Sequence, residues 1–209
     1  IKIISAYSRA PEAFVIFSKD QNIKSPKDLK GKKVAGPKGT ILNELLVRYL
    51  ALGGLSINDV EFISMGIPAA QAALENGSVD AALLAGPAAY NAQKSGLNVV
   101  TTGKGVITPV IVTATSGEFY KKHKDVVEKF KKAQDEILAY IKTNEDEALK
   151  FTAEETGLSI DAVKSMYPQY DFSSKITADD IKALEFTQEF MLESKMIEHK
   201  IDIKSLLLN

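Results

Sequence analysis

The sequence contains no cysteine, which excludes thiol catalysis, disulfide bonds and thiolate metal sites. No apolar run approaches the roughly 20 residues that a membrane-spanning helix needs. Charge of one sign is not in surplus, because 26 Lys and Arg residues are interspersed with 27 Asp and Glu residues. This balance disfavours binding to nucleic acid or to an acidic membrane surface.

Residues that could carry catalysis or hold a cofactor are also scarce. His123 and His199 lie in charged stretches without a metal-ligand spacing, and we interpret both as solvated surface residues. Residues 31–40 lack the GxxxxGK[ST] order of a phosphate-binding loop, and residues 103–105 lack the third glycine of a dinucleotide fingerprint. We therefore predict no catalytic residue, no metal site and no cofactor.

What the sequence does contain is a regular alternation of strands and helices from residue 33 onward. A hydrophobic content of 45% over 209 residues is enough for a sizeable core. The alternation predicts a parallel sheet with crossover helices. The predicted strands are 33–36, 60–65, 79–85 and 97–102, and the predicted helices are 40–52, 68–75 and 87–94.

The two ends of the chain follow a different pattern. Strands are predicted at 1–6 and 13–18, and a β-rich run at 106–115 ends the alternation. The remainder is predicted to be almost wholly helical. It includes a long helix with an apolar stripe from Val126 to Ile141, helices at 144–155 and 159–166, a helix opened by Thr177 and Asp180, and a short docking helix within 201–208. Asn144 and Glu147 resemble a capping box.

Three of the predicted helices begin directly after a strand, at Thr40, Pro68 and Pro87, with glycine close before each start. Glycine and proline leave the first backbone N–H groups uncovered by bulky or acidic side chains. In open α/β sheets, ligands sit at the carboxyl ends of the strands. The pattern therefore indicates a seat for a small polar or anionic group, although ordinary loop punctuation in βα units explains it equally well.

Three polar or aromatic residues outside the core pattern are further candidates. Tyr7 and Arg9 follow the first strand, where an arginine could clamp an anion bidentately. The alternative for Arg9 is an ordinary loop charge. Tyr90 lies one turn into the helix that follows Pro87, and core packing is at least as good an explanation for it as ligand contact.

Residues 23–40, IKSPKDLKGKKVAGPKGT, resemble the signature of periplasmic solute-binding proteins from ABC importers of the nitrate, sulfonate, taurine and thiamine-pyrimidine-precursor group. Further pieces follow in the family order: LALGGLSINDVEFISM, IPAAQAALENGSVDAALLAGPAAY and EFYKKHKDVVEKFKKAQDEILAYIKTNEDEALKF. The resemblance implies an α/β fold of the two-lobed type II periplasmic-binding-protein class. It places Gly39, Thr40, Gly66, Ile67, Pro68, Ala69, Gly86 and Pro87 at the cleft face of one lobe.

The resemblance also implies the domain organisation. Lobe A would comprise residues 1–18 and 109–209, lobe B would comprise residues 19–108 as a parallel α/β domain, and the crossings would lie near 18–21 and 103–108. Family members begin with further βα units, whereas this sequence starts at Ile1 without Met, so we expect a cut or abbreviated chain and an incomplete lobe A. Exposed apolar surface and an open sheet edge then predict self-association through lobe A, and a partial pocket wall predicts weak ligand affinity.

The expected function is that of the extracytoplasmic substrate-binding component of an ABC importer for a small organic anion or heterocycle. The expected partners are that solute and a membrane permease, with no nucleic acid, in a periplasmic or extracytoplasmic location where a membrane-anchored lipoprotein form stays open. One alternative is an enzyme of the same fold, such as a thiamine-pyrimidine synthase or a menaquinone-pathway enzyme; the synthase would need an iron-binding Cys/His set that is missing here. The other alternative is the effector-binding domain of a transcription regulator.

Overall fold

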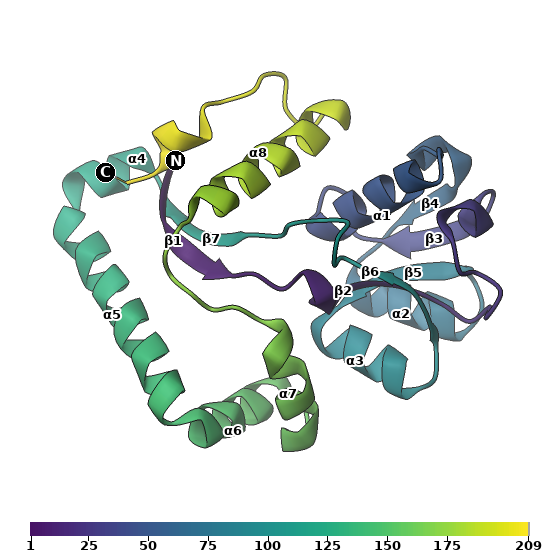
Figure 1. The fold of residues 1–209 in the computed structure, drawn as a ribbon, viewed down its shortest axis with the longest axis horizontal. Helices are drawn as coiled ribbons and strands as arrows, with labels where there is room; N and C mark the ends of the chain where they lie inside the picture. The colour runs from purple at the N-terminus through teal and green to yellow at the C-terminus, as the bar shows by residue number, and fades with distance from the viewer. Residues whose placement is uncertain (209) are drawn as a thin grey trace. The chain divides into compact units, whose positions relative to one another are not determined.

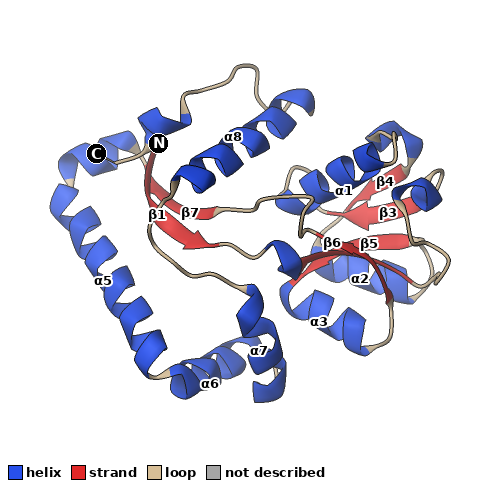
Figure 2. Cartoon of the chain, in the orientation of Figure 1, coloured by secondary structure: helices blue, strands red, loops and turns tan. Residues whose placement is uncertain are grey.

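The computed structural model describes residues 1–208, which form two compact units (Figures 1 and 2). Unit 1 consists of residues 1–10 together with the chain from Pro109 onward, and unit 2 consists of Pro11–Thr108. The expected lobe boundary at residue 18 is wrong. Strand β2 (Phe14–Ser18) pairs with two strands of unit 2, so the chain passes into unit 2 after Ala10.

The sheet of unit 2 has five strands in the order β4-β3-β5-β2-β6. Its other strands are β3 (Lys33–Gly36), β4 (Glu61–Ser64), β5 (Ala81–Ala85) and β6 (Asn98–Thr102). β3 is parallel to β4 and β5, as expected, but β2 is antiparallel to both β5 and β6, so the sheet is mixed rather than purely parallel. β2 reads as a continuous apolar run because both of its faces are covered by core.

Helices cover both faces of this sheet. One face packs on α1 (Ile41–Leu52), and the other packs on α2 (Ile67–Glu75) and α3 (Gly86–Lys94). Alternate strand residues divide between the two layers: Val34 and Leu83 join the α1 side, whereas Ala35 and Leu84 join the α2–α3 side. Short 3-10 helices at Pro11–Ala13, Pro26–Leu29 and Ile57–Asp59 complete the unit.

Unit 1 has little sheet and much helix. Its strands β1 (Lys2–Ser8) and β7 (Ile111–Thr115) form an antiparallel pair. The helices that follow are α4 (Gly117–Lys122), α5 (Lys124–Thr143), α6 (Glu145–Thr156), α7 (Ile160–Met166) and α8 (Ala178–Glu193), with 3-10 helices at Tyr167–Gln169 and Ile203–Leu206. The docking helix expected within 201–208 is the 3-10 helix at Ile203–Leu206. After it, Leu207 forms a parallel β-bridge with Ile3.

The second edge of β1 is not open, contrary to the expectation. The Ala6 N–H donates to the carbonyl of Ser174 in the loop before α8 (2.9 Å). The Leu208 N–H of the C-terminal tail donates to the Ile3 carbonyl (3.3 Å). In addition, the Gln134 side chain on α5 donates to the Ala6 carbonyl (2.8 Å). Loop, tail and helix side chain therefore take the place of a further strand.

Candidate ligand-binding site at the helix starts of unit 2

The connections of unit 2 diverge between two neighbouring strands, β3 and β5. The chain leaves β3 through α1 toward β4, and it leaves β5 through α3 toward β6, which lies in the opposite direction along the sheet. α1 and α3 also lie on opposite faces. This is the topological switch point of an open α/β sheet, where the loops that follow the two strands separate and leave room for a ligand.

β3, β4 and β5 are mutually parallel, so the helices that follow them begin at one edge of the sheet. The sequence prediction that the starts of α1, α2 and α3 share an edge is therefore in agreement with the strand directions. The starts of α1 and α3 flank the switch point, whereas α2 follows the outermost strand, β4. The switch point is therefore flanked by Gly39, Thr40, Gly86 and Pro87, which are better placed to contact a ligand there than the Gly66–Ala69 turn.

We call a helix start uncapped where no side chain in the described chain accepts a hydrogen bond from its first-turn N–H groups. The start of α1 is uncapped, because the Thr40 hydroxyl donates to the Pro37 carbonyl (2.9 Å) instead of facing the helix. The acidic residue of this turn, Glu44, is buried and paired with Arg48 (2.7 Å), so its charge is compensated on the helix itself.

The starts of α2 and α3 are uncapped as well, and their first turns contain no acidic residue within the described chain. Each begins one residue earlier than predicted, at Ile67 and at Gly86, with Pro68 and Pro87 in the second position. Gly86 has φ +57°, a left-handed conformation in which a side chain would be strained although the space around it is open. These features leave the first N–H groups available to an external acceptor.

Tyr90, the aromatic candidate on α3, is half-buried, and the ammonium of Lys94 lies 5.7 Å from its ring centroid. This cation–π contact already employs one face of the ring. The contact lies within α3 itself, between residues four positions apart.

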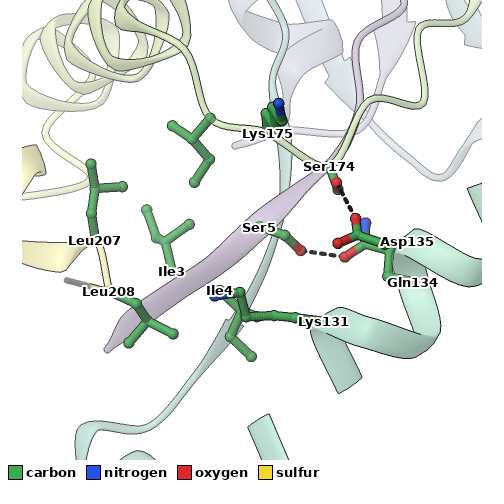
Figure 3. A pocket seen from close by; sticks show the side chains of 11 residues that line it. Ile3, Ile4, Ser5, Lys131, Gln134, Asp135, Ser174, Lys175, Leu207 and Leu208 are labelled. Carbon is green, nitrogen blue, oxygen red and sulfur yellow. Dashed lines mark hydrogen bonds between the residues drawn. The ribbon is translucent and has the colours of Figure 1, made fainter. Parts of the chain in front are cut away.

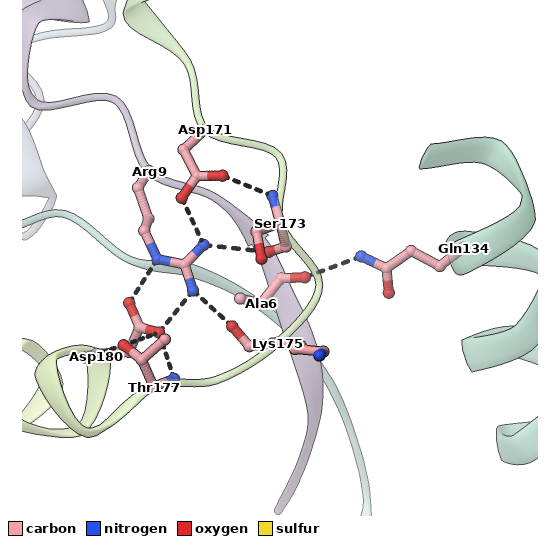
Figure 4. Close-up of polar contacts among 8 residues, drawn as sticks. All are labelled: Ala6, Arg9, Gln134, Asp171, Ser173, Lys175, Thr177 and Asp180. Carbon is pink, nitrogen blue, oxygen red and sulfur yellow. Dashed lines mark hydrogen bonds and ion pairs between the residues drawn. The ribbon is translucent and has the colours of Figure 1, made fainter. Parts of the chain in front are cut away.

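Arg9 does not have the role expected for it as an anion clamp. Its Nε and Nη2 donate to the two oxygens of Asp180 at 2.5 Å each, Nη1 reaches Asp171 (3.2 Å) and the Ser173 carbonyl (3.1 Å), and Nη2 reaches the Lys175 carbonyl (2.7 Å; Figure 4). All five donors of the guanidinium are used within unit 1. Arg9 ties the end of β1 to the loop before α8.

Asp180 is the centre of this network, and its side chain is only 4% exposed. The Arg9 guanidinium lowers the pKa of Asp180 from its ordinary 3.8 to about 2, with help from Thr177 and against the opposing effect of burial. Tyr7, on β1, is 57% exposed. Both Tyr7 and Arg9 belong to unit 1, whereas the helix starts belong to unit 2.

A cavity of about 310 Å³ lies in unit 1 between β1, α5 and the C-terminal tail (Figure 3). Its polar groups bond mainly to one another: the Ser5 hydroxyl donates to Gln134 (2.5 Å), and the Ser174 hydroxyl donates to Asp135 (2.6 Å). Leu207, Leu208 and Ile3 form its apolar wall. With its hydroxyl and amide groups already paired, this cavity is a weaker ligand site than the helix starts.

Sequence reasoning missed Asn43, whose side chain holds the loop that leads into α1. Asn43 is 5% exposed on α1, and its carbonyl oxygen accepts the Gly39 N–H at 3.1 Å. A polar residue at a core-facing position of α1 was the available signal, because a buried amide needs partners. Asn43 fixes the loop before α1 without covering the N–H groups at the helix start itself.

Among residues 1–208, no helix is both long and apolar enough to cross a membrane. Over the same residues, no group of three or more His, Asp or Glu side chains is arranged to hold a metal ion.

The chain is similar to a candidate aliphatic sulfonates-binding protein of Bacillus subtilis strain 168, with 31% identity over 199 residues. That alignment covers 93% of this chain, which spans 60% of the length of the relative. Among solved structures, the periplasmic aliphatic sulphonate binding protein SsuA of Escherichia coli matches with a TM-score of 0.83 and 22% identity, covering 98% of this chain and 72% of that one.

The fold also occurs in an enzyme. The desulfurization enzyme DSZB matches with a TM-score of 0.75 and 17% identity, covering 99% of this chain and 76% of that one. The expected type II periplasmic-binding-protein fold is thus confirmed. The NMT1/THI5-like family model matches residues 1–148, and the chain belongs to that family.

Proposed function

We propose that the chain is the solute-binding component of an ABC importer and that unit 2 holds a small organic anion at the starts of α1 and α3. The observation that carries this proposal is the pair of uncapped helix starts on either side of the switch point. Each start offers unpaired N–H donors at the positive end of a helix dipole, which favours an anionic oxygen group by about 0.3–1 kcal/mol at an exposed site.

Within the classes considered, an aliphatic sulfonate suits these starts best. A sulfonate presents three acceptor oxygens and one negative charge, which match backbone donors that come from two directions. A heterocycle such as a pyrimidine would need an aromatic stacking partner, and one face of the Tyr90 ring is already covered by the Lys94 ammonium. The name of the Bacillus subtilis relative supports the same ligand class.

The solute would be passed to a membrane permease, and the protein would act outside the cytoplasm, either free or as a lipid-anchored form. A second copy of this chain is a further proposed partner, through exposed apolar side chains of unit 1. We propose no catalysis, because the helix starts offer backbone donors and the Thr40 hydroxyl is engaged by the Pro37 carbonyl.

Isothermal titration with short alkanesulfonates tests the site directly, with the variant Thr40→Asp as the probe. Aspartate is a good N-cap, so the variant should be as stable as the parent or more so. Its carboxylate would occupy the N–H groups and repel an anion, so sulfonate affinity should fall roughly tenfold or more, which is about 1.4 kcal/mol.

The matched control is Ser116→Asp at the start of α4 in unit 1, where Ser116 already accepts the Phe119 N–H (3.0 Å). This variant adds the same charge at a helix start but should leave sulfonate affinity unchanged. Equal loss in both variants would indicate long-range charge repulsion rather than a site at α1. Conversion of a sulfinate or sulfonate by the purified protein would contradict the non-catalytic proposal.

A further inference from the structure

Helix α2 ends in an asparagine–glycine step, and Asn76-Gly77 is the only such step in the sequence. Asn76, Gly77 and the following Ser78 are all exposed. Gly77 has φ +79°, and a Cβ built on it meets no atom of the described chain within 4 Å. The main chain at Gly77 is therefore open to solvent and unhindered by a side chain.

The backbone of this step forms a Schellman cap at the end of α2. The Gly77 N–H donates to the Leu74 carbonyl (3.2 Å), and the Ser78 N–H donates to the Ala73 carbonyl (2.9 Å). The first of these bonds lies at the long end of the range for N–H···O bonds, and helix ends fray. The Gly77 nitrogen is thus held by one long bond in the last turn of the helix.

The side chain of Asn76 receives both donors of Ser78. The Ser78 N–H donates to Oδ1 of Asn76 at 2.8 Å, and the Ser78 hydroxyl donates to the same oxygen. Two donors on one carbonyl oxygen stabilise the negative charge that develops there when a nucleophile adds to the carbonyl carbon. Ser78 therefore activates the Asn76 amide toward attack.

We propose that Asn76 is a site of spontaneous deamidation, with Ser78 as the residue that activates its amide. The Gly77 nitrogen loses its proton to a solvent base and bonds to Cγ of Asn76. The Cγ–Nδ2 bond then breaks, and Nδ2 takes up a proton and leaves as ammonia. Water opens the five-membered succinimide at either carbonyl: addition at Cγ gives aspartate, and addition at the main-chain carbonyl gives isoaspartate. The reaction needs only this helix end and water.

The products differ from the parent at the cap. Closure of the succinimide removes the Gly77 N–H, so its bond to the Leu74 carbonyl is lost. Isoaspartate inserts an extra carbon into the main chain, which displaces the Ser78 N–H from the Ala73 carbonyl. Either acid also adds a negative charge at the C-terminal end of α2, where the helix dipole is negative. Deamidation should therefore loosen the end of α2 and destabilise unit 2.

Incubation in mildly alkaline buffer followed by peptide mapping tests the proposal, which is independent of solute binding. Asn58 is the internal reference, because it is also exposed but is followed by Asp59. Asn76 should deamidate roughly tenfold faster or more, because glycine reaches backbone conformations that Asp59 does not. Labelling by an isoaspartyl methyltransferase should appear in the same peptide. Equal rates at Asn76 and Asn58 would overturn the proposal.

The variant Ser78→Ala tests the activating role. It removes the hydroxyl donor and keeps the N–H, so deamidation should slow roughly three- to tenfold, which corresponds to one hydrogen bond. A purely structural role predicts the opposite, because a weakened cap would free the Gly77 nitrogen and speed the reaction. Unchanged or faster deamidation in Ser78→Ala would therefore overturn the role of Ser78.

The end of α3 provides a matched comparison. Ser95 and Gly96 occupy the same positions of a Schellman cap, in which Gly96 has φ +78° and the two cap bonds are 3.1 Å each. Ser95→Asn creates the same step there, but the next residue is Leu97, which has no hydroxyl. The new step should deamidate more slowly than Asn76, by about the factor measured for Ser78→Ala. Equal rates at the two helix ends would contradict activation by Ser78.

Thermal unfolding of aged protein tests the consequence for stability. Asn76→Asp is the control, because it carries the new charge on an ordinary main chain. The isoaspartate fraction, separated by ion exchange, should unfold at a lower temperature than both the parent and Asn76→Asp. Identical unfolding of all three would overturn the proposed loosening of α2.

Discussion

The helices of the two units begin in different ways. In unit 1, hydroxyl caps serve α4, α7 and α8, where Ser116, Ser159 and Thr177 each accept a first-turn N–H. The remaining two, α5 and α6, have acidic residues in the first turn. In unit 2, α2 and α3 have neither feature within the described chain, and the hydroxyl at the start of α1 is turned away.

This difference matters because a cap and a ligand compete for the same N–H groups. A helix that serves only to stabilise the fold gains about 1 kcal/mol from a cap. In unit 2, α1, α2 and α3 lack this stabilisation by a cap at their starts. The hydrophobic core on both faces of the sheet compensates for its loss. Unit 1 has a smaller sheet and exposed apolar side chains, so its stability depends more on caps and polar networks.

The largest expected effect comes from truncating an apolar side chain in the core of unit 2, compared with one in unit 1. Leu46 on α1 is fully buried, and Leu46→Ala should lower the free energy of unfolding by about 2–5 kcal/mol through lost burial and a cavity. Phe151 on α6 is 52% exposed, and Phe151→Ala should cost far less despite removing a larger side chain. Urea unfolding followed by circular dichroism checks both. A comparable loss at Phe151 would mean that unit 1 is more tightly packed than its exposure indicates.

The Arg9 network should be the strongest polar contribution to unit 1. Asp180→Asn leaves Arg9 without its main counter-charge and should cost about 3 kcal/mol, the lower end for a broken buried pair because Arg9 is 17% exposed. Asp171→Asn is the control: Asp171 is 58% exposed, and the loss should be about 0–1 kcal/mol. Equal losses would contradict the ranking by burial.

The same network predicts an acid sensitivity in unit 1. The pKa of Asp180 is about 2 in the folded protein against an ordinary 3.8, so its contribution is fully present above about pH 4 and is lost as the pH falls toward 2. Thermal unfolding of the parent chain across this range should therefore show a loss that the Asp180→Asn variant lacks. Parallel pH profiles for the two proteins would count against this origin.

How much could be predicted from the sequence depends on the range of the interaction. Local patterns sufficed for the crossover helices and for the edge at which they begin, because glycine, proline and apolar spacing act within a few residues. They failed for β2, whose partners β5 and β6 are distant in sequence. A buried apolar strand such as β2 could belong to either unit. Only its pairing with strands that are distant in sequence shows that it belongs to unit 2.

The functional residues divide in the same way. Arg9 looked like a free loop charge because its acceptors lie some 160–170 positions away, at Asp171 and Asp180. The capping box expected at Asn144 is wrong for a local reason: Asn144 also ends α5, and its amide donates to the Tyr140 carbonyl (3.1 Å) there. The Asn144 side chain therefore caps the end of α5 and not the start of α6, and the sequence does not rank the two demands.

The smallest expected effect is also the sharpest test of the contrast between the units, because it uses the same substitution at two helix starts. Thr177→Ala removes a hydroxyl that accepts the Asp180 N–H (3.2 Å) and should cost about 1 kcal/mol. Thr40→Ala removes an exposed hydroxyl that bonds only to the Pro37 carbonyl and should cost less than about 0.5 kcal/mol, the low end for a hydrogen bond. Chemical denaturation resolves this difference if the two unfolding transitions are fitted separately. Equal costs would mean that the Thr40 hydroxyl caps α1 in solution, and the first N–H groups of that helix would then be unavailable to an anion.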